Sequence, residues 1–273
     1  PNIKEFKLPQ KVLTNNLNDI LKDKDINFVN VVTPIQTHAE LVIKFLKNNK
    51  NVLVEKPLVM NQIQKNKINR LLKHNKIKLL VSYPYLFSKT LSNAKKIVNS
   101  KNLGSIKFID INILQCGRFM KYDVNHLLGP HAISILGIFF NINNIKFEIN
   151  KIISNNKKCE TVFVKCTQNS KMIGSINLSL NYANTTNKKL VNIYLKNGII
   201  VCDLNNKKHT LSSFTYSRTK KDSYKVANVK NQINKFYDEK NNMRDVIDNF
   251  YLKKNDNYNF VLTKKINEFL NNV

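Results

Sequence analysis

Two apolar runs, each followed by polar residues, constrain the fold of this chain more than any other part of its sequence. The first run, Phe28–Val32, leads into Thr33-Pro34, and the second, Asn51–Val54, leads into Glu55-Lys56-Pro57. Apolar side chains recur at helical spacing between the two runs. A strand, a helix and a second strand form one unit of a parallel α/β sheet, and such sheets bind ligands at the carboxyl ends of their strands. The pattern therefore predicts a binding site at the residues after both runs.

The segment from Val29 to Leu58 resembles the dinucleotide-binding domain of the glucose–fructose oxidoreductase, inositol dehydrogenase and rhizopine catabolism family (Gfo/Idh/MocA). It contains the patterns T-P-x-x-T-H at residues 33–38 and E-K-P at residues 55–57, which line the nicotinamide in that family. The resemblance extends to Gly129-Pro130-His131. It implies an NAD(P)-dependent oxidoreductase, with NAD or NADP as cofactor. Such an enzyme transfers hydride between the nicotinamide and a ring hydroxyl or keto carbon of a sugar or nucleotide sugar.

The resemblance assigns Lys56 as a catalytic residue that also binds the substrate. A lysine held at the end of an apolar strand can hydrogen-bond the hydroxyl that is oxidised and help to move its proton. A solvated surface lysine is the alternative interpretation. The cofactor-binding residues that the resemblance implies are Thr33, Pro34, His38, Glu55, Lys56 and Pro57. For His38, the alternative is a solvated residue in the first turn of a helix.

His131 is the second catalytic residue that the resemblance implies. In relatives, a D-x-G/A-P-H segment supplies an aspartate and, four residues later, a histidine that removes the hydroxyl proton. In this chain Leu127 occupies the place of the aspartate, and Ala132 replaces an acidic residue that is common after the histidine. Leucine cannot accept a proton, so we expect His126 to substitute only in part. A histidine at the start of a helix, with no catalytic task, is the alternative.

Further substrate-binding residues are implied by segments that resemble family members acting on nucleotide-linked or other activated sugars in polysaccharide synthesis. These segments are Cys116-Gly117-Arg118 and Asp123-Val124-Asn125. Arg118 can clamp a carboxylate or phosphate with paired hydrogen bonds, and a surface arginine in a loop is the competing interpretation. The predicted substrate-binding set is therefore Lys56, Arg118, Asn125, His126 and His131.

The order of predicted elements indicates two domains in 273 residues. Residues 1–82 are expected to form an incomplete doubly wound parallel (Rossmann) sheet, and residues 83–273 an α+β substrate-binding and oligomerisation domain with a mainly antiparallel open sheet. The strands predicted for the second domain are residues 106–114, 146–154, 161–167, 172–180, 190–195 and 199–204. The last five of them are expected to form an antiparallel meander. Predicted helices begin at Thr37, where Thr37 and Glu40 form a capping-box signature, near Asn61 and at Pro130. Two C-terminal helices, near residues 243–251 and 262–270, return toward the first domain.

The glycine-rich phosphate-binding motif of such domains, G-x-G-x-x-G, occurs nowhere among the six glycines of the chain. Because a helix-like segment at residues 13–21 precedes any predicted strand, we expect an N-terminally truncated fragment that lacks the glycine-rich βαβ unit. A relative that lost this unit is the other interpretation. A catalytically inactive binding or interaction protein is therefore an alternative function.

The formal net charge of +27 suggests a nucleic-acid partner at first sight. However, only four of the 45 basic residues are arginines, and the lysines are spread along the chain, whereas nucleic-acid readers more often cluster arginine. We therefore expect no specific nucleic acid and keep a basic nucleic-acid-binding protein as a further alternative. The four cysteines show no metal-ligand or C-x-x-C spacing, which favours a reducing cytoplasm and no metal. No membrane partner is expected, and the open sheet is expected to form a homodimer or homotetramer.

Overall fold

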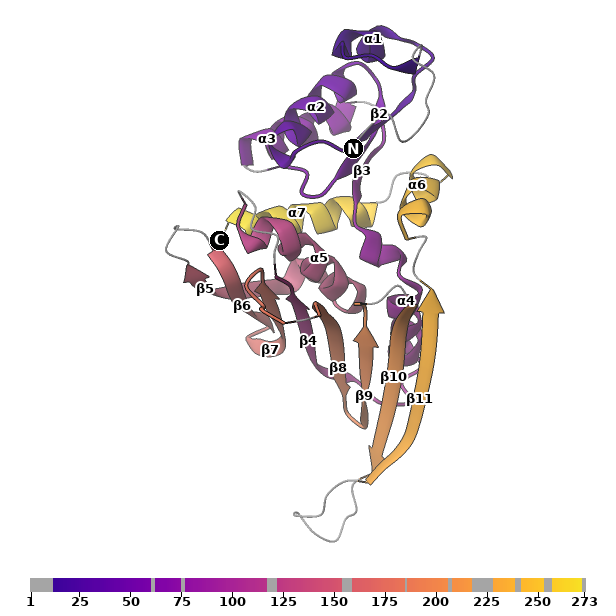
Figure 1. Cartoon of the computed structure of the whole chain (residues 1–273), viewed down its shortest axis with the longest axis vertical. Coiled ribbons are helices and arrows are strands. Elements are labelled where there is room, and N and C mark those ends of the chain that lie inside the picture. The colour runs from indigo at the N-terminus through magenta and orange to yellow at the C-terminus, as the bar shows by residue number, and fades with distance from the viewer. Residues whose placement is uncertain are drawn as a thin grey trace. The chain divides into compact units, whose positions relative to one another are not determined.

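The computed structural model describes residues 12–59, 62–74, 77–116, 122–153, 159–184, 186–205, 208–217, 228–238, 242–252 and 257–271. The chain divides into two compact units, Pro1–Val81 and Ser82–Val273 (Figure 1). None of the described helices is both long and apolar enough to cross a membrane.

The first unit contains a three-stranded sheet in the order β1 (Phe28–Val31), β2 (Asn51–Glu55) and β3 (Leu79–Ser82). Strands β1 and β2 are parallel, with Val29 opposite Val52. Helix α2 (Ile35–Lys47) connects them, α3 (Gln62–His74) connects β2 to β3, and a short helix α1 (Leu17–Lys22) precedes β1. The middle of β2 is buried on both faces, which is typical of a central strand in an α/β sheet. The predicted Rossmann-type fold class is confirmed.

The predicted start of α2 is wrong, and so is the capping box assigned to it. The helix begins at Ile35, with Pro34 at the N-cap and no side-chain cap. Thr37 therefore lies inside the first turn, where its hydroxyl donates to the Pro34 carbonyl oxygen at 2.8 Å. Glu40 forms an ion pair with Lys44 at 2.6 Å in place of the reciprocal cap. Proline has a backbone φ angle close to the helical value and lacks an N–H, so it suits the helix start.

The second unit contains an eight-stranded sheet in the order β11-β10-β9-β8-β4-β7-β6-β5. Its strands are β4 (Ile106–Leu114), β5 (Ile145–Ile153), β6 (Cys159–Gln168), β7 (Lys171–Ser179), β8 (Lys188–Leu195), β9 (Gly198–Asp203), β10 (Lys208–Ser217) and β11 (Asn228–Asp238). The sheet is mainly antiparallel, as predicted. The meander is wrong at one point, because β4 inserts between β7 and β8 and pairs with β7 in parallel. Strands β10 and β11 were not predicted.

Helices cover one face of this sheet. Helix α4 (Lys89–Asn99) contacts β9, β10 and β11, and α5 (Val124–Phe139) contacts β4, β6 and β7. On β4, Ile109, Ile111 and Ile113 point into this core and are at most 2% exposed. The helix predicted to begin at Pro130 begins at Val124, six residues earlier. Proline removes only one intrahelical hydrogen bond, so buried packing on both sides can carry a helix through it.

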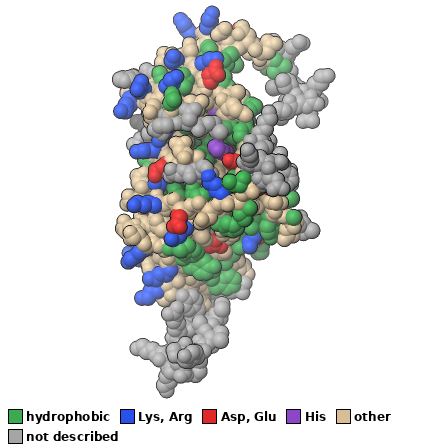
Figure 2. Space-filling model, turned by 90° about the vertical axis from the view of Figure 1, so that its left-hand side faces the viewer, with side chains coloured by type: hydrophobic (Ala, Val, Ile, Leu, Met, Phe, Trp, Pro, Cys, Tyr) green, Lys and Arg blue, Asp and Glu red, His purple; other side chains and the backbone are tan. Residues whose placement is uncertain are grey.

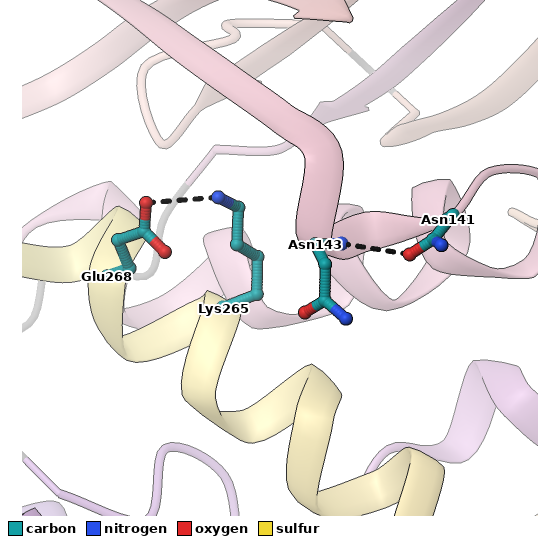
Figure 3. Close-up of polar contacts among 4 residues, drawn as sticks. All are labelled: Asn141, Asn143, Lys265 and Glu268. Atoms are coloured by element: carbon teal, nitrogen blue, oxygen red, sulfur yellow. Dashed lines mark hydrogen bonds and ion pairs between the residues drawn. The ribbon is translucent and has the colours of Figure 1, made fainter.

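The two C-terminal helices are α6 (Asn242–Leu252) and α7 (Asn257–Asn271), close to the predicted positions. Helix α7 packs against α5 and against the short 3₁₀ helix η4 (Ile142–Asn144). Lys265 of α7 is 5% exposed and donates to Glu268 at 3.0 Å (Figure 3). Its Nζ atom lies 5.5 Å from the centroid of the Phe147 ring. Both contacts compensate for the cost of burying this ammonium group.

Candidate functional site

The residues that follow β1 and β2 form the first part of the candidate site. Because the two strands are parallel and in register, their carboxyl ends lie at the same edge of the sheet. Thr33-Pro34 follows β1, and Lys56-Pro57 follows β2. The peptide bond between Lys56 and Pro57 is cis. The two predicted motifs therefore meet at one edge of the first unit.

Hydrogen bonds in the first turn of α2 determine what the Thr33 hydroxyl can offer a ligand. Thr37 Oγ1 donates to the Pro34 carbonyl oxygen, and Thr33 Oγ1 lies 2.6 Å from Thr37 Oγ1. A hydroxyl carries a single hydrogen, so Thr37 accepts from Thr33. The exposed Thr33 oxygen keeps its lone pairs and acts toward a ligand as an acceptor.

His38 lies between the two motifs and is 1% exposed, so it is not a solvated helix residue. Its Nδ1 atom is 2.8 Å from the Pro57 carbonyl oxygen, and its Nε2 atom is 2.8 Å from the Thr33 carbonyl oxygen. The tautomer determines which nitrogen donates. A cofactor contact by His38 stays a prediction, and the observed contacts connect the two turns to each other through one side chain.

Glu55 and Lys56 are half-buried, at the end of β2 and in the following turn. Leu58 and Val59, directly after Pro57, are both 3% exposed. Their burial anchors the turn on its carboxyl-terminal side, because removing two aliphatic side chains from water stabilises this conformation. Lys56 therefore projects from a backbone that is fixed before it by the sheet and after it by the core.

The start of α5 holds the predicted site residues of the second unit. Asp123 is the N-cap, and its carboxylate accepts a hydrogen bond from the Cys159 backbone N–H at 3.0 Å. Asn125 is fully buried and donates weakly to Cys159 Sγ at 3.8 Å. Its Oδ1 atom accepts no hydrogen bond within the part of the chain that the structure describes. The substrate contact predicted for this fully buried amide stays a prediction.

His126 and His131 are both half-buried on α5. Burial lowers the pKa of His126, and the negative charge of Asp123 opposes this effect in part. The His131 ring meets Tyr85 edge to face, with ring centroids 5.3 Å apart and an interplanar angle of 88°. Burial raises the pKa of the Tyr85 phenol to about 12, so this group stays neutral at physiological pH.

Tyr85 is a site neighbour that the sequence analysis missed. It lies in the 3₁₀ helix η3 (Pro84–Phe87), directly after β3. Its position after the third strand was a signal, because it extends the pattern of residues that follow the first two strands. Leu127, in the place of the family's aspartate, is half-buried. An apolar side chain there offers no hydrogen bond to a hydroxyl.

Arg118, predicted to bind the substrate, lies outside the described residues. No group of three or more histidine, cysteine or acidic side chains suited to a metal ion occurs in the described ranges. The convergence of Lys56 and His131 on one substrate stays a prediction, because the two residues belong to different units.

Comparison with known proteins identifies the first unit. Residues 3–83 match the model of the oxidoreductase family with an NAD-binding Rossmann fold, GFO_IDH_MocA. This segment is similar to the NAD-binding domain of that family. The chain is 23% identical over 221 residues to an uncharacterized protein of Saccharomyces cerevisiae, an alignment that covers 74% of the chain and 62% of the yeast protein. Over 86 residues it is 28% identical to the scyllo-inositol 2-dehydrogenase (NAD(+)) of Bacillus subtilis, covering 32% of the chain and 25% of that enzyme.

The fold of this chain also occurs in solved structures. KijD10, a 3-ketoreductase from Actinomadura kijaniata in complex with TDP-benzene and NADP, matches with a TM-score of 0.77 and 12% identity. The match covers 94% of this chain and 80% of KijD10. At this identity the likeness establishes the fold, including the large second sheet. The chain spans less than two thirds of the length of the first curated relatives that it matches.

Proposed function

We propose that this chain is an NAD(P)-dependent oxidoreductase, or part of one, acting on a hydroxyl or keto carbon of a sugar or nucleotide sugar. The observation that supports this most directly is the edge of the first sheet. There, the cis Lys56-Pro57 turn and the Thr33-Pro34 turn are connected through one buried histidine. Lys56 is thereby presented from a rigid turn at the edge where α/β sheets bind ligands.

The residues at this edge fit the nicotinamide half of the cofactor. The Thr33 oxygen is left as an acceptor, which suits a donor such as a ribose hydroxyl or the carboxamide. The residues that would hold this half are Thr33, Pro34, Glu55, Lys56 and Pro57. The glycine-rich turn that lets a backbone approach a pyrophosphate is absent from this sequence. When bound, the nicotinamide accepts or supplies the hydride.

The protein side of the reaction is proton transfer and orientation. Lys56 hydrogen-bonds the reacting oxygen and orients the carbon that bears it, and His131 exchanges the proton of that oxygen with solvent or with a neighbour. Tyr85, packed edge-on against the imidazole, restricts the rotation of the His131 ring. Because Leu127 cannot bond a hydroxyl, a sugar would be held at this point by fewer polar contacts. Asn125, His126 and Arg118 are the remaining candidates for holding the substrate.

The substrate class follows from proteins with the same fold and from the relatives by sequence. KijD10 is a 3-ketoreductase that was solved in complex with TDP-benzene, and the Bacillus subtilis relative is a scyllo-inositol dehydrogenase. The TDP-linked ligand of the first supports a nucleotide-linked substrate of this chain, and the name of the second supports a polyhydroxylated six-membered ring. A basic residue such as Arg118 would add affinity for a diphosphate group.

Cofactor binding tests the proposal before any substrate is known. Titration of the chain with NADH and with NADPH, followed by nicotinamide fluorescence, is expected to show saturable binding of one of them. A screen of nucleotide sugars and inositols with that cofactor should then give turnover that disappears in Lys56→Ala. If neither dinucleotide binds to the chain or to a form extended by its upstream reading frame, the oxidoreductase assignment is wrong.

A catalytically inactive relative is the second candidate function, and Leu127 is the observation that favours it. In this case the chain would bind a cofactor or a sugar without catalysing hydride transfer between them. Binding without turnover across the screen, together with no gain from Leu127→Asp, would support this candidate. A specific nucleic-acid binder is a weaker candidate, because Lys and Arg side chains lie in small separate groups on the face drawn in Figure 2.

We further propose that the open face of the second sheet pairs with another copy of the chain. This face, opposite α4 and α5, exposes Phe163 and Tyr194 at 45% and 41%. At its centre the Asp110 carboxylate accepts hydrogen bonds from Ser175, Asn112, Asn177 and Asn192 at 2.6–3.3 Å. These four donors satisfy hydrogen-bond acceptors of the Asp110 carboxylate, which lowers the cost of covering it.

Sedimentation velocity tests this interface. The wild-type chain is expected to sediment as a dimer or larger species, and Tyr194→Asp as a monomer.

The four cysteines are free, and three of them are buried. Together with their spacing, this supports a reducing, cytoplasmic setting.

A further inference from the structure

Both ring nitrogens of His38 contact backbone carbonyl oxygens, one in the Thr33-Pro34 turn and one in the Lys56-Pro57 turn. We infer from this geometry, and on the basis of the proposed function, that His38 is a positioning residue. It would set Lys56 at a defined place relative to the Thr33-Pro34 turn and would not itself touch the nicotinamide. The contacts that carry this inference are Nδ1 to the Pro57 oxygen and Nε2 to the Thr33 oxygen, both 2.8 Å long.

Burial excludes the main alternatives for this side chain. His38 is 1% exposed, and each of its two polar atoms already has a partner within hydrogen-bond distance. A ring nitrogen would therefore have to leave a carbonyl oxygen before it could bond a ligand, and turning the single N–H of the neutral ring away would cost the hydrogen bond that it donates. Contact with the cofactor would thus destabilise the turns that the cofactor needs.

The place of His38 in the chain explains why it can connect the two turns. It is the fourth residue of α2, which begins directly after Pro34. A side chain in the first turn of a connecting helix points back toward the amino end of that helix. In a parallel strand–helix–strand unit this end lies at the carboxyl edge of the sheet. The imidazole is planar and has nitrogens on opposite sides, so it reaches the turn before the helix and the turn after the next strand.

The two contacts have different expected roles. The Nε2 contact holds Thr33, whose hydroxyl is left as an acceptor for the cofactor. The Nδ1 contact holds Pro57, the residue directly after Lys56. Loss of the first should therefore weaken cofactor binding, whereas loss of the second should displace the lysine and slow the chemical step.

Two amide variants separate the contacts, because the side-chain nitrogen of asparagine occupies a place near Nδ1 and that of glutamine a place near Nε2. His38→Asn should keep the contact to Pro57 and lose the one to Thr33, and His38→Gln should do the reverse. A neutral imidazole carries one N–H, so a change of about 10-fold, the equivalent of one hydrogen bond, is expected for the variant that loses the donating nitrogen. For His38→Asn this change is a rise in the cofactor Kd with kcat retained, and for His38→Gln it is a fall in kcat with a smaller change in Kd.

Hydrogen exchange gives a readout that needs no cofactor. Mass-spectrometric exchange of the wild-type chain and of His38→Asn, His38→Gln and His38→Ala should show faster exchange in different peptides. The peptide containing Thr33 should respond to asparagine, the peptide containing Lys56 to glutamine, and both to alanine. Val42→Ala is the matched control, since Val42 lies one turn further along the same helix, is fully buried and has no side-chain group that can hydrogen-bond either carbonyl oxygen. It should raise exchange evenly across the first unit.

The outcomes separate this inference from the proposed function. Absence of dinucleotide binding by the wild-type chain would count against the oxidoreductase, and the exchange pattern would still decide the role of His38. If the three His38 variants and Val42→Ala give the same even pattern, the histidine is an ordinary core residue and the inference is wrong. A structure with a nicotinamide atom hydrogen-bonded to the imidazole would also overturn it. If His38→Ala does not fold, the two amide variants decide between these results.

Discussion

The edge of the first sheet and the start of α5 present their polar groups in different ways. At the sheet edge, the key contacts are made by backbone carbonyl oxygens to one buried side chain. At α5 the candidate groups are side chains, of which Asn125 is buried, His126 and His131 are half-buried, and Leu127 offers no polar atom. The backbone contacts at the sheet edge keep the two turns in fixed positions, whereas the side chains at the start of α5 determine which substrate can be bound.

This difference indicates how the two regions can diverge. A turn that is held through its backbone tolerates many side chains, provided that the proline and the histidine stay in place. A pocket built from side chains changes its ligand whenever one of them is replaced, as Leu127 illustrates. The edge of the first sheet should therefore bind the cofactor as in an active oxidoreductase, even if the side chains at the start of α5 bind a different substrate or none.

The largest effect is expected for Lys56→Ala, which removes the group proposed to hold the reacting oxygen. Loss of a general acid or base typically costs about 10²–10⁴-fold in rate. We expect a fall of this size in kcat, measured by absorbance of the reduced nicotinamide in single-turnover experiments. The cofactor Kd should rise by a smaller factor than kcat falls, because Lys56 is one of five residues proposed to hold the nicotinamide half and the turn itself is held by its backbone.

Lys56→Arg is the control for charge. Arginine keeps the positive charge, but its planar guanidinium does not readily give up a proton, so turnover should stay low. Full activity in Lys56→Arg would mean that only the positive charge of residue 56 matters. Unchanged kcat in Lys56→Ala would contradict the catalytic role proposed for the edge of the first sheet, and the contrast with the start of α5 would then no longer hold.

A smaller loss is expected when the histidines of α5 are replaced. His131→Asn removes the proposed proton carrier and should lower kcat by about 10²-fold, at the lower end of such effects. His126→Asn should mainly raise KM, because that residue is proposed only to bind the substrate. Steady-state kinetics of both variants with the best substrate of the screen checks this. A larger loss of kcat in His126→Asn than in His131→Asn would exchange the roles of the two residues.

Much of the fold could be predicted, because apolar periodicity reports burial directly. Strand β4 alternates buried and half-exposed residues and was predicted with the observed bounds. Strands β10 and β11 were missed because their sequences lack this signal. The inward positions of β10 include His209 and Ser213, and β11 is rich in lysine, asparagine and glutamine. Polar residues suit an edge strand, whose unpaired backbone would otherwise attract other chains.

Only those parts of the candidate site that depend on short segments of the sequence could be predicted. Positions after strand ends identified Thr33 and Lys56, since parallel strands bring such residues to one edge. The double contact of His38 depends on two turns that are 24 residues apart at Thr33 and Pro57, and no local pattern reports that distance. The start of α5 was misplaced for a related reason. Pro130 indicates a helix start locally, and only the surrounding core allows the helix to continue through it.

An effect on stability alone is expected for Gly129→Ala, in the middle of α5. A Cβ atom at this position would lie 2.7 Å from Cε1 of the Phe269 ring, which is fully buried on α7. This buried ring must shift to admit the methyl group, so the free energy of unfolding should fall by about 1–3 kcal/mol, as for other overpacked cores. Urea denaturation of the variant measures this change.

Phe269→Leu provides the matched test of that contact. The smaller side chain opens space beside Gly129, so the double variant should be more stable than the sum of the two single effects predicts. Strict additivity would show that the added methyl group acts through something other than the Phe269 ring. In either case the first unit should keep its hydrogen-exchange pattern, because the substitution lies entirely in the second.

The smallest effect concerns the pH dependence of the second unit through His126. Burial lowers the pKa of this imidazole from 6.5 in the folded chain. As the pH falls below about 6.5, the unfolded chain binds a proton at this residue before the folded chain does, so the unfolded state is favoured. The stabilising contribution is therefore fully present above that pH and is lost below it. His126→Gln should flatten the decline in the urea midpoint on the acidic side, and an equally steep decline would show that His126 is protonated equally readily in both states.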